Sequence, residues 1–309
     1  MSIDASASAL LRDAAAAAAG GQQYPASTLY VVATPIGNLA DLSLRAIQVL
    51  SLVDAVACED TRVTGGLLRH LGLDKPLLAL HQHNEHAASG QVLERLRLGQ
   101  RVAYVSDAGT PAISDPGAVL VAAVVQQGLR VFPVPGASSA VTALSVAGDV
   151  QADGFVFAGF LPTKAGERRE ALLALAASPR AQVLFEAPHR IVALTDLLAE
   201  LLPERRVTVC RELTKQFEAV NTMPAADLPA WMQADAMRAR GEFVLVLHAA
   251  PPVAVDDAAL PPAATRALAV LMRELPLKQA VSLAAELSGS PRNALYEHAL
   301  AQKKLADGA

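Results

Sequence analysis

The chain has few aromatic residues, few cysteines and no long apolar run. Aromatic residues make up only 4% of its 309 residues although 52% are hydrophobic, so alanine, leucine and valine must fill the interior. The two cysteines, Cys58 and Cys210, lie far apart inside apolar runs. This spacing excludes a disulfide framework and indicates reduced, buried thiols in a cytoplasmic protein. No apolar run approaches the roughly 18 residues that a membrane span needs, so we expect no membrane contact.

Three common enzyme signatures are also absent. The chain contains no G-x-G-x-x-G, no G-x-x-x-x-G-K-[ST] and no G-x-S-x-G, which argues against a Rossmann NAD site, a P-loop and a hydrolase nucleophile elbow. The net charge is −4, so a nucleic-acid partner would have to meet a local basic patch. The first 21 residues are rich in alanine and carry Asp4 before any base, unlike a signal peptide. We expect residues 1–27 to form a mobile, partly helical tail.

A mostly parallel five-stranded sheet is predicted over residues 28–147. Short apolar segments alternate there with helical segments, which favours right-handed crossovers between parallel strands. Ligands bind beyond the carboxyl ends of such strands, and in this chain those ends carry unusual polar, glycine and proline residues. The predicted strands are 29–33, 55–58, 77–80, 101–105 and 130–134.

The fourth strand leads into RVAYVSDAGTPAISDPG, residues 101–117. Asp107 follows the strand, and Gly109 would let a ligand approach the backbone. Residues 114–117 (SDPG) are predicted to cap the helix that begins at Ala118. Two further loops of this kind, 34–37 and 135–139, favour a shared ligand site over an ordinary strand-to-helix loop. An adenine-bearing cofactor without a polyphosphate needs backbone donors, a carboxylate and small side chains, as supplied by Asp107, Gly109, Ser138 and Ser139.

The character of the chain changes near Gly148. Residues 148–249 predict a second α/β domain with a mixed sheet, and residues 250–262 form a proline-rich linker. Residues 263–303 predict three short helices with helix–turn–helix geometry.

Charged clusters at strand ends have both a structural and a functional interpretation. Residues 59–62 (EDTR) are either a local ion pair or an acid and a base that face the substrate. Clusters 186–190 and 211–215 are either solvated helix caps or contacts for an anionic ligand. Three basic residues one helical turn apart form either a solvated face or a phosphate patch: Lys164, Arg168 and Arg169.

The segment from His81 to His86 contains three histidines, a residue type that often binds metal ions. His81, His83 and His86 with Glu85 have the right ligand atoms, but no second ligand pair lies nearby in the sequence. We therefore expect no metal.

Taken together, the motifs resemble those of the ribosomal RNA small-subunit methyltransferase I family, within the tetrapyrrole-methylase superfamily. They are TPIGNLADLSLRA, CEDTR, HQHNE, VSDAGTPAISDPG, PVPGASSA, GFLPTK, FEAPHR, RELTKQFE and GEFVLVL, and they run from about Leu29 to Leu247. The helical tail resembles the helix–turn–helix domain of family members. Ala33, where a proline is common, and the alanine-rich leader depart from the family pattern.

The resemblance implies a fold and an activity. The fold is α/β, with two α/β domains of tetrapyrrole-methylase type and a small C-terminal helical domain. The activity is S-adenosylmethionine-dependent 2′-O-methylation of a cytidine ribose in the decoding region of 16S ribosomal RNA. The partners are the RNA, in the small ribosomal subunit, and a second copy of the chain in a homodimer.

The resemblance also implies a cofactor site between the two α/β domains. We expect Asp107 to accept hydrogen bonds from the cofactor, and Phe185 and Arg211 to cover it. The full set of predicted cofactor-binding residues is Pro35, Ile36, Gly37, Asp107, Gly109, Thr110, Ser138, Ser139, Phe185 and Arg211.

A ribose hydroxyl must lose its proton during transfer, so a carboxylate base is expected. Glu59 is the first candidate because Arg62 can hold it ionised, and Glu186 is the second. Lys164 or Lys215 would polarise the developing alkoxide. The residues expected to contact RNA are Arg62, Arg168, Arg169, His189 and Arg190.

Three alternatives remain open at this stage. A methylase of a tetrapyrrole or another small molecule would share the fold, although the basic strand ends and the helical tail favour a polyanion. A nucleic-acid-binding module would leave the three-loop pocket without a role. A different α/β enzyme, such as a hydrolase, would need a nucleophile elbow.

Overall fold

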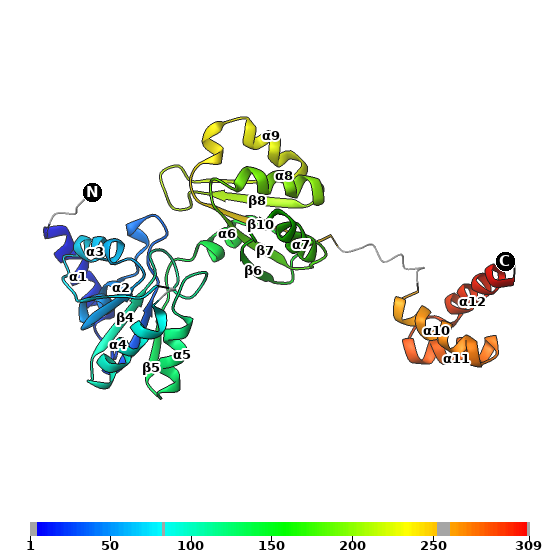
Figure 1. Ribbon diagram of the computed structural model, residues 1–309, viewed down its shortest axis with the longest axis horizontal. Coiled ribbons are helices and arrows are strands. Elements are labelled where there is room, and N and C mark those ends of the chain that lie inside the picture. Colours follow the sequence, from blue (N-terminus) through cyan, green and yellow to red (C-terminus); the bar gives the residue numbers. More distant parts are fainter. Residues whose placement is uncertain (1–4, 82–83, 252–259, 308–309) are drawn as a thin grey trace. The chain divides into compact units, whose positions relative to one another are not determined.

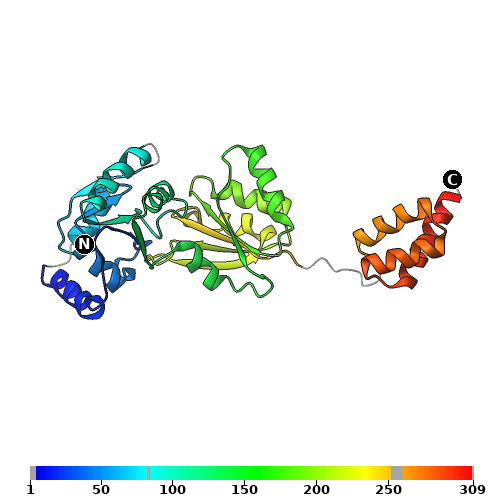
Figure 2. The same ribbon diagram turned by 90° about the horizontal axis from the view of Figure 1, so that it is seen from below.

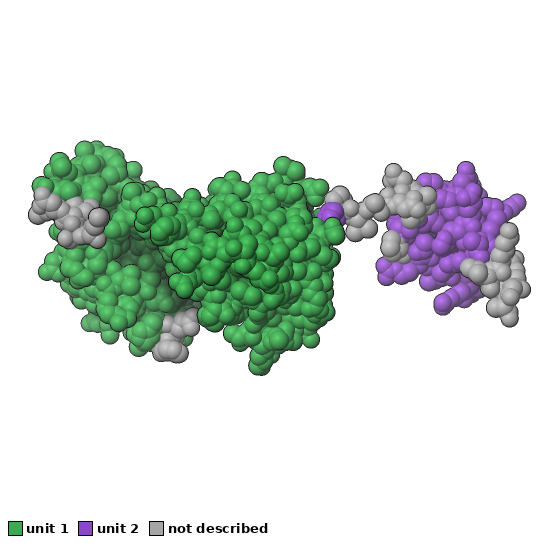
Figure 3. All heavy atoms as spheres, turned by 90° about the horizontal axis from the view of Figure 1, so that it is seen from above, with its two compact units in different colours: residues 1–250 green, residues 251–309 purple. Residues whose placement is uncertain are grey.

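The computed structural model describes residues 5–81, 84–251 and 260–307. The chain divides into two compact units, residues 1–250 and 251–309 (Figure 3). Unit 1 holds two five-stranded sheets, and unit 2 is helical. Among the described residues, no helix combines the length and the apolar character required to cross a bilayer.

The first sheet is parallel throughout and has the strand order β3-β2-β4-β1-β5. This confirms the parallel sheet predicted from the alternation of strands and helices. All five carboxyl ends therefore lie along one edge, where the TPIG, EDTR and SDAGTP segments follow. The strands are β1 (Thr28–Val32), β2 (Ala55–Cys58), β3 (Leu77–Ala79), β4 (Arg101–Val105) and β5 (Arg130–Val134).

Helices cover both faces of the first sheet (Figure 1). Because side chains alternate along a strand, Tyr30 and Val105 pack on one face with α1, α2 and α3. Leu29 and Tyr104 pack on the other with α4 and α5. Burial on both faces explains why these strands are apolar throughout. The helices are α1 (Ala5–Ala19), α2 (Leu44–Leu52), α3 (Thr61–His70), α4 (Glu85–Arg97) and α5 (Ala118–Gln126).

The second sheet is mixed, as predicted, with the order β6-β7-β10-β8-β9. β6 and β7 are parallel, and the other neighbours are antiparallel. β9 was not predicted because AVNTMP lacks an apolar alternation and ends in proline. The strands are β6 (Phe155–Phe160), β7 (Ala181–Glu186), β8 (Arg206–Arg211), β9 (Ala219–Pro224) and β10 (Phe243–Leu247).

Helix α6 (Ser139–Ala147) joins the two halves of unit 1 (Figure 2). Its buried alanines, Ala140, Ala143 and Ala147, belong to one apolar cluster with Val183 and Val246 of the second sheet. Small side chains allow the helix to approach that sheet closely, which brings the carboxyl edge of the first sheet against it. The opposite face is covered by α7 (Ala165–Ala176), α8 (Ile191–Leu201) and α9 (Leu228–Gln233).

Unit 2 consists of three helices around a small core that includes Leu268, Val281 and Leu295. Gly289, with φ +68°, ends the second of them in the left-handed conformation that glycine adopts without strain. The helices are α10 (Pro262–Glu274), α11 (Leu277–Ser288) and α12 (Arg292–Asp307).

The leader differs from the mobile tail that we expected, because α1 packs on the first domain. Ala15 and Ala19 are buried, and Ser8 Oγ donates a hydrogen bond to the His70 carbonyl at 2.9 Å. Arg12 donates to the carbonyls of Leu71 and Gly72, which follow α3. A face of small side chains lets α1 approach α2 closely, and this face is not recognisable in an alanine-rich sequence.

The packing of α1 predicts a difference between two alanines of this helix. Ala15→Asp should lower the free energy of unfolding by about 2 kcal/mol or more, because it places a carboxylate in the core. Ala17→Asp changes an exposed position of the same helix and should have little effect. Urea denaturation of both variants measures the difference, and equal stabilities would contradict the packed helix.

Candidate active site

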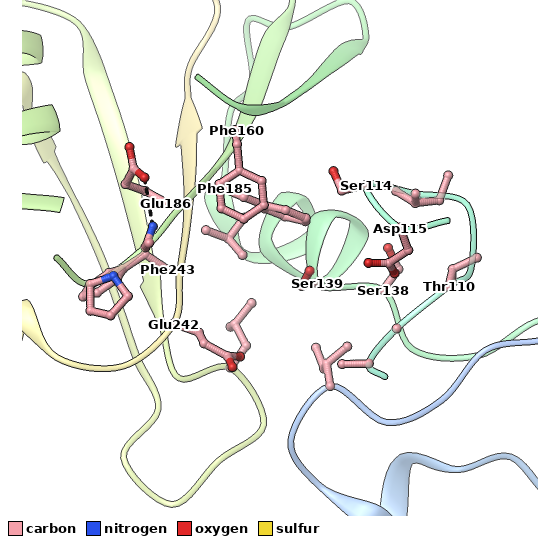
Figure 4. Close-up of a pocket in the computed structure, with 18 residues that line it drawn as sticks. Thr110, Ser114, Asp115, Ser138, Ser139, Phe160, Phe185, Glu186, Glu242 and Phe243 are labelled. Carbon is pink, nitrogen blue, oxygen red and sulfur yellow. Dashed lines mark hydrogen bonds between the residues drawn. The ribbon is translucent and has the colours of Figure 1, made fainter. Parts of the chain in front are cut away.

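A cavity of about 410 Å³, here called the first cavity, lies between the carboxyl edge of the first sheet and the second sheet (Figure 4). The surface of unit 1 is hollowed between its two lobes in Figure 3. The volume falls within the range of small-molecule sites. Six of the ten residues predicted to bind a cofactor line it: Ile36, Gly109, Thr110, Ser138, Ser139 and Phe185.

Three of the other four line a smaller cavity of about 210 Å³, here called the second cavity. These are Pro35, Gly37 and Asp107. Reciprocal backbone hydrogen bonds of 2.9 and 3.0 Å between Thr34 and Gly109 join the two loops that contribute to both cavities. A φ of +82° at Gly109 favours glycine in that bridge.

Arg211 lines neither cavity. Its guanidinium donates to the carbonyls of Arg240 and Phe217, at 3.3 and 3.2 Å. The structure therefore gives Arg211 a role in shaping the loop after β8, and it does not bring this side chain to the predicted cofactor site.

The apolar wall of the first cavity comes from the second sheet. The Phe185 ring packs edge-on against Phe157 and Phe160, with centroids 5.0 and 5.7 Å apart. The next residue, Glu186, lies on the opposite face of β7, and its carboxylate points away from the Phe185 ring (Figure 4). Glu186 is fully buried and its Oε1 lies 3.1 Å from Nε of Arg190, which is 15% exposed.

The Glu186–Arg190 pair therefore joins the end of β7 to the start of α8 at the wall of the first cavity, which Glu186 itself lines. Arg190 also donates to the carbonyls of Leu161 and Pro162. Removing either partner would leave a buried charge without its partner. Glu186 nevertheless lines the first cavity, so the base predicted there stays a prediction. The phosphate contact predicted at Arg190 does not fit, because Glu186 and two backbone carbonyls engage its guanidinium.

Two carboxylates that the sequence did not single out line the first cavity, Asp115 and Glu242. Burial raises the pKa of Asp115, a hydrogen bond from Ser106 opposes the shift, and nearby Asp107 reinforces it. Asp115 belongs to the SDAGTPAISDPG motif, but its SDPG context is also that of a helix cap, so its sequence alone did not distinguish the two roles.

The predicted cap at Ser114 and Asp115 was wrong. Helix α5 begins after Gly117, and no side chain of the SDPG segment caps it. Glu85, at the start of α4, does so instead, because its Oε1 accepts hydrogen bonds from the backbone N–H groups of Gly117 and Val119 at 2.7 and 3.2 Å. The SDPG segment is thereby free to face the cavity.

Glu59 lies among carboxylates and is not paired with Arg62 as expected. Arg62 binds Asp60, with Nη2 and Oδ2 2.6 Å apart, and Asp60 also caps α3. Burial raises the pKa of Glu59, and the charges of Asp107, Asp115 and Asp60 raise it further. A carboxylate with a raised pKa is a better proton acceptor near neutral pH than one held ionised by an arginine.

Lys215 lines neither cavity but contacts a lining residue of each. Its Nζ lies 2.9 Å from Glu212 and 3.0 Å from Glu242, which lines the first cavity. A Cβ at Gly37, which lines the second cavity, would lie 2.5 Å from Lys215 Cγ. Partial burial lowers the pKa of Lys215, but the two carboxylates outweigh it and the net shift is upward. Lys215 is therefore a stable cation at the shared rim.

The other predicted basic residues have partners within the chain. Lys164 pairs with Glu167, and Arg169 pairs with Glu200. Arg168 donates to the carbonyls of Pro162 and Thr163. Exposed pairs of this kind contribute little stability, so these side chains can exchange partners. His189 is exposed just beyond the cavity.

The part of the chain that the structure describes contains no group of three or more His, Cys, Asp or Glu side chains arranged to hold a metal ion. His83 lies outside the described residues.

Residues 28–229 match the model of the Tetrapyrrole (Corrin/Porphyrin) Methylases, and residues 258–303 match that of the RsmI C-terminal HTH domain. Ribosomal RNA small subunit methyltransferase I of Escherichia coli O157:H7 is 48% identical over 276 residues, which cover 89% of this chain and 95% of that protein. The chain belongs to this methyltransferase family. The Pseudomonas aeruginosa member is 47% identical over 89% of this chain and 97% of its own length.

Solved structures confirm the fold class of this family member. Uroporphyrin-III-C-methyltransferase from Thermus thermophilus has a TM-score of 0.52 and 23% identity, covering 72% of this chain and 94% of its own. A diphthine synthase has a TM-score of 0.53 and 15% identity, and the match covers 72% of this chain and 90% of the diphthine synthase chain. At these identities the likeness shows the tetrapyrrole-methylase fold alone.

The raised pKa of Asp115 predicts a pH-dependent stability. Between its ordinary pKa of 3.8 and the higher folded value, the folded protein retains a proton that the unfolded chain has released. Stability therefore falls as pH rises through this window. Asp115→Asn should raise the free energy of unfolding at pH 7, and the gain should shrink as pH falls towards 3.8. Urea denaturation across pH measures this, and a gain independent of pH would contradict it.

Proposed function

We propose that this protein transfers a methyl group from S-adenosylmethionine to the 2′-hydroxyl of a cytidine in the decoding region of 16S ribosomal RNA. The observation that carries the proposal is the first cavity, built by the SDAGTP, TPIG and PGASS loops against the second sheet, in a member of the ribosomal RNA small subunit methyltransferase I family. The substrate is the RNA in the small ribosomal subunit, and the enzyme acts as a cytoplasmic homodimer.

The first cavity fits S-adenosylmethionine. A Thermus thermophilus uroporphyrin-III C-methyltransferase of the same fold, at 19% identity, was solved in complex with S-adenyl homocysteine. Here, Ser138 and Ser139 offer hydroxyls, and Gly109 brings backbone groups to the surface of the cavity. Phe185 gives an apolar wall, and carboxylates at Asp115 and Glu242 suit a cationic ligand. When bound, the cofactor supplies an activated methyl group.

The residues of this chain then have to hold the ribose and accept its proton. Glu59 is the proton acceptor, because its raised pKa suits that role and the neighbours that raise it, Asp107 and Asp115, line the two cavities. Lys215, held at the shared rim by Glu212 and Glu242, stabilises negative charge on the 2′-oxygen. Arg62, whose side chain is 88% exposed, contacts phosphate.

Methyl transfer to two substrates tests the proposal. Purified protein with labelled S-adenosylmethionine should methylate small ribosomal subunits that lack the modification, and nuclease digestion should recover 2′-O-methylcytidine. Uroporphyrinogen should receive no label. Label on the tetrapyrrole instead would assign the chain to the small-molecule methylases of the same fold, and label on a base would overturn the ribose assignment.

The two predicted bases should respond differently to the same change. Glu59→Gln should lower the single-turnover rate by about 10²–10⁴ with RNA affinity and folding retained, because proton acceptance is lost. Glu186→Gln should lower thermal stability, because it leaves Arg190 without its charged partner. If Glu59→Gln weakens RNA binding and leaves the saturated rate intact, Glu59 positions the RNA and is not the base.

A further inference from the structure

The second cavity has about half the volume of the first and a different lining. Leu39, Val63 and Leu67 supply apolar walls, and Asp107 supplies a polar group. It lies at the same carboxyl edge of the first sheet, and Lys215 spans the rim between the two. A cavity of this volume, with both apolar and polar side chains in its lining, suits a single flat ring that has polar edges and apolar faces.

Helix α3 keeps this cavity open at a cost to its own stability. It contains two adjacent glycines, Gly65 and Gly66, and each destabilises a helix interior by about 1 kcal/mol relative to alanine. Gly66 lines the cavity, and the nearest atom to a Cβ built there is Arg69 Nη2 at 3.9 Å. A larger side chain at position 66 would therefore meet no backbone atom, but it would fill part of the cavity.

One polar side chain of the cavity, Asp107, has hydrogen-bonding capacity left. The Oγ1 of Thr64, a residue only 2% exposed, is buried beside the Cys58 thiol and does not reach the cavity surface. Asp107 accepts one hydrogen bond at Oδ1, from the backbone N–H of Asp60 at 3.0 Å. That bond fixes the carboxylate while its other oxygen remains an acceptor at the cavity.

We infer that the second cavity binds the unstacked base of the target cytidine, with Asp107 accepting a hydrogen bond from the exocyclic amine. This inference rests on the proposed function, since it concerns the same substrate. A carboxylate is the side chain that pairs with the N4 amine of cytosine. Sequence-specific recognition of RNA uses such unstacked bases and their Watson–Crick edges. The base enters one cavity, and its ribose then lies at the rim beside the other.

A change of base preference tests Asp107. An asparagine keeps the acceptor for the Asp60 N–H but can donate to the O4 carbonyl of uracil. Single-turnover methylation is measured on small subunits that carry cytidine or uridine at the target position. Asp107→Asn should lower the cytidine-to-uridine rate ratio by about 5- to 150-fold, the discrimination of one good base contact. Asp74→Asn, an exposed change at the opposite edge of the sheet, should keep the wild-type ratio.

The outcomes separate this inference from the proposed function. An unchanged ratio in Asp107→Asn, with an active wild type, overturns the base pocket and leaves the proposed activity standing. If calorimetry shows that Asp107→Asn changes the affinity for S-adenosylmethionine while the cytidine-to-uridine rate ratio is unchanged, Asp107 binds the cofactor instead. A wild type that methylates neither substrate removes the proposed function, and this inference falls with it.

Filling the cavity provides a second test that does not endanger folding. Gly66→Leu places a side chain into open space and raises helix propensity, so thermal stability should hold or rise. RNA methylation should fall at least tenfold while S-adenosylmethionine affinity is unchanged. Gly90→Leu, at an exposed position of α4 with nothing within 4 Å of its Cβ, is the matched control. Full methylation by Gly66→Leu would overturn the inference.

Discussion

The pairing of Thr34 with Gly109 is the constraint on which the site depends. It extends the contact between β1 and β4 beyond their ends, and Thr34 Oγ1 strengthens it by donating to the Ser106 carbonyl at 3.1 Å. The residues of the two paired loops are divided between two sides of the bridge. Ile36 and Thr110 line the first cavity, whereas Pro35 and Asp107 line the second. One short bridge thus separates two neighbouring cavities.

Carboxylates and one lysine lie close together near the two cavities. Carboxylates crowd together at Glu59, Asp107 and Asp115, and their repulsion with burial raises the pKa of Glu59. Such crowding destabilises the fold, which is the common signature of a site kept for function. Lys215 compensates from the second sheet, but its partners Glu212 and Glu242 already hold it, so its position is fixed before any ligand arrives. A fixed cation stabilises developing charge without reorganisation.

The sequence predicted the fold well because apolar strands and punctuating loops are local signals. The mixed second sheet also followed from its strand composition, but β9 did not, since Ala219 to Pro224 owes its conformation to pairing with β8. The packing of α1 could not be predicted either, because a run of alanines does not show which face is buried. For the site, the sequence predicted which loops line the cavities, but it did not predict which way their side chains point. Glu186 follows a strand end as expected, yet alternation along β7 turns it towards Arg190.

Asp107 and Gly109 are two residues apart in the sequence but line different cavities. In the sequence, Asp107 and Gly109 belong to one motif, so one ligand was assigned to both. In the structure, Gly109 faces a cavity large enough for a nucleoside, and Asp107 faces a smaller one behind the bridge. Gly66 of α3 supports this division from the other wall, because it lines the smaller cavity and its missing side chain leaves that space open at a cost in helix stability. A transferase that joins two substrates needs two sites side by side, and this short motif contributes to both.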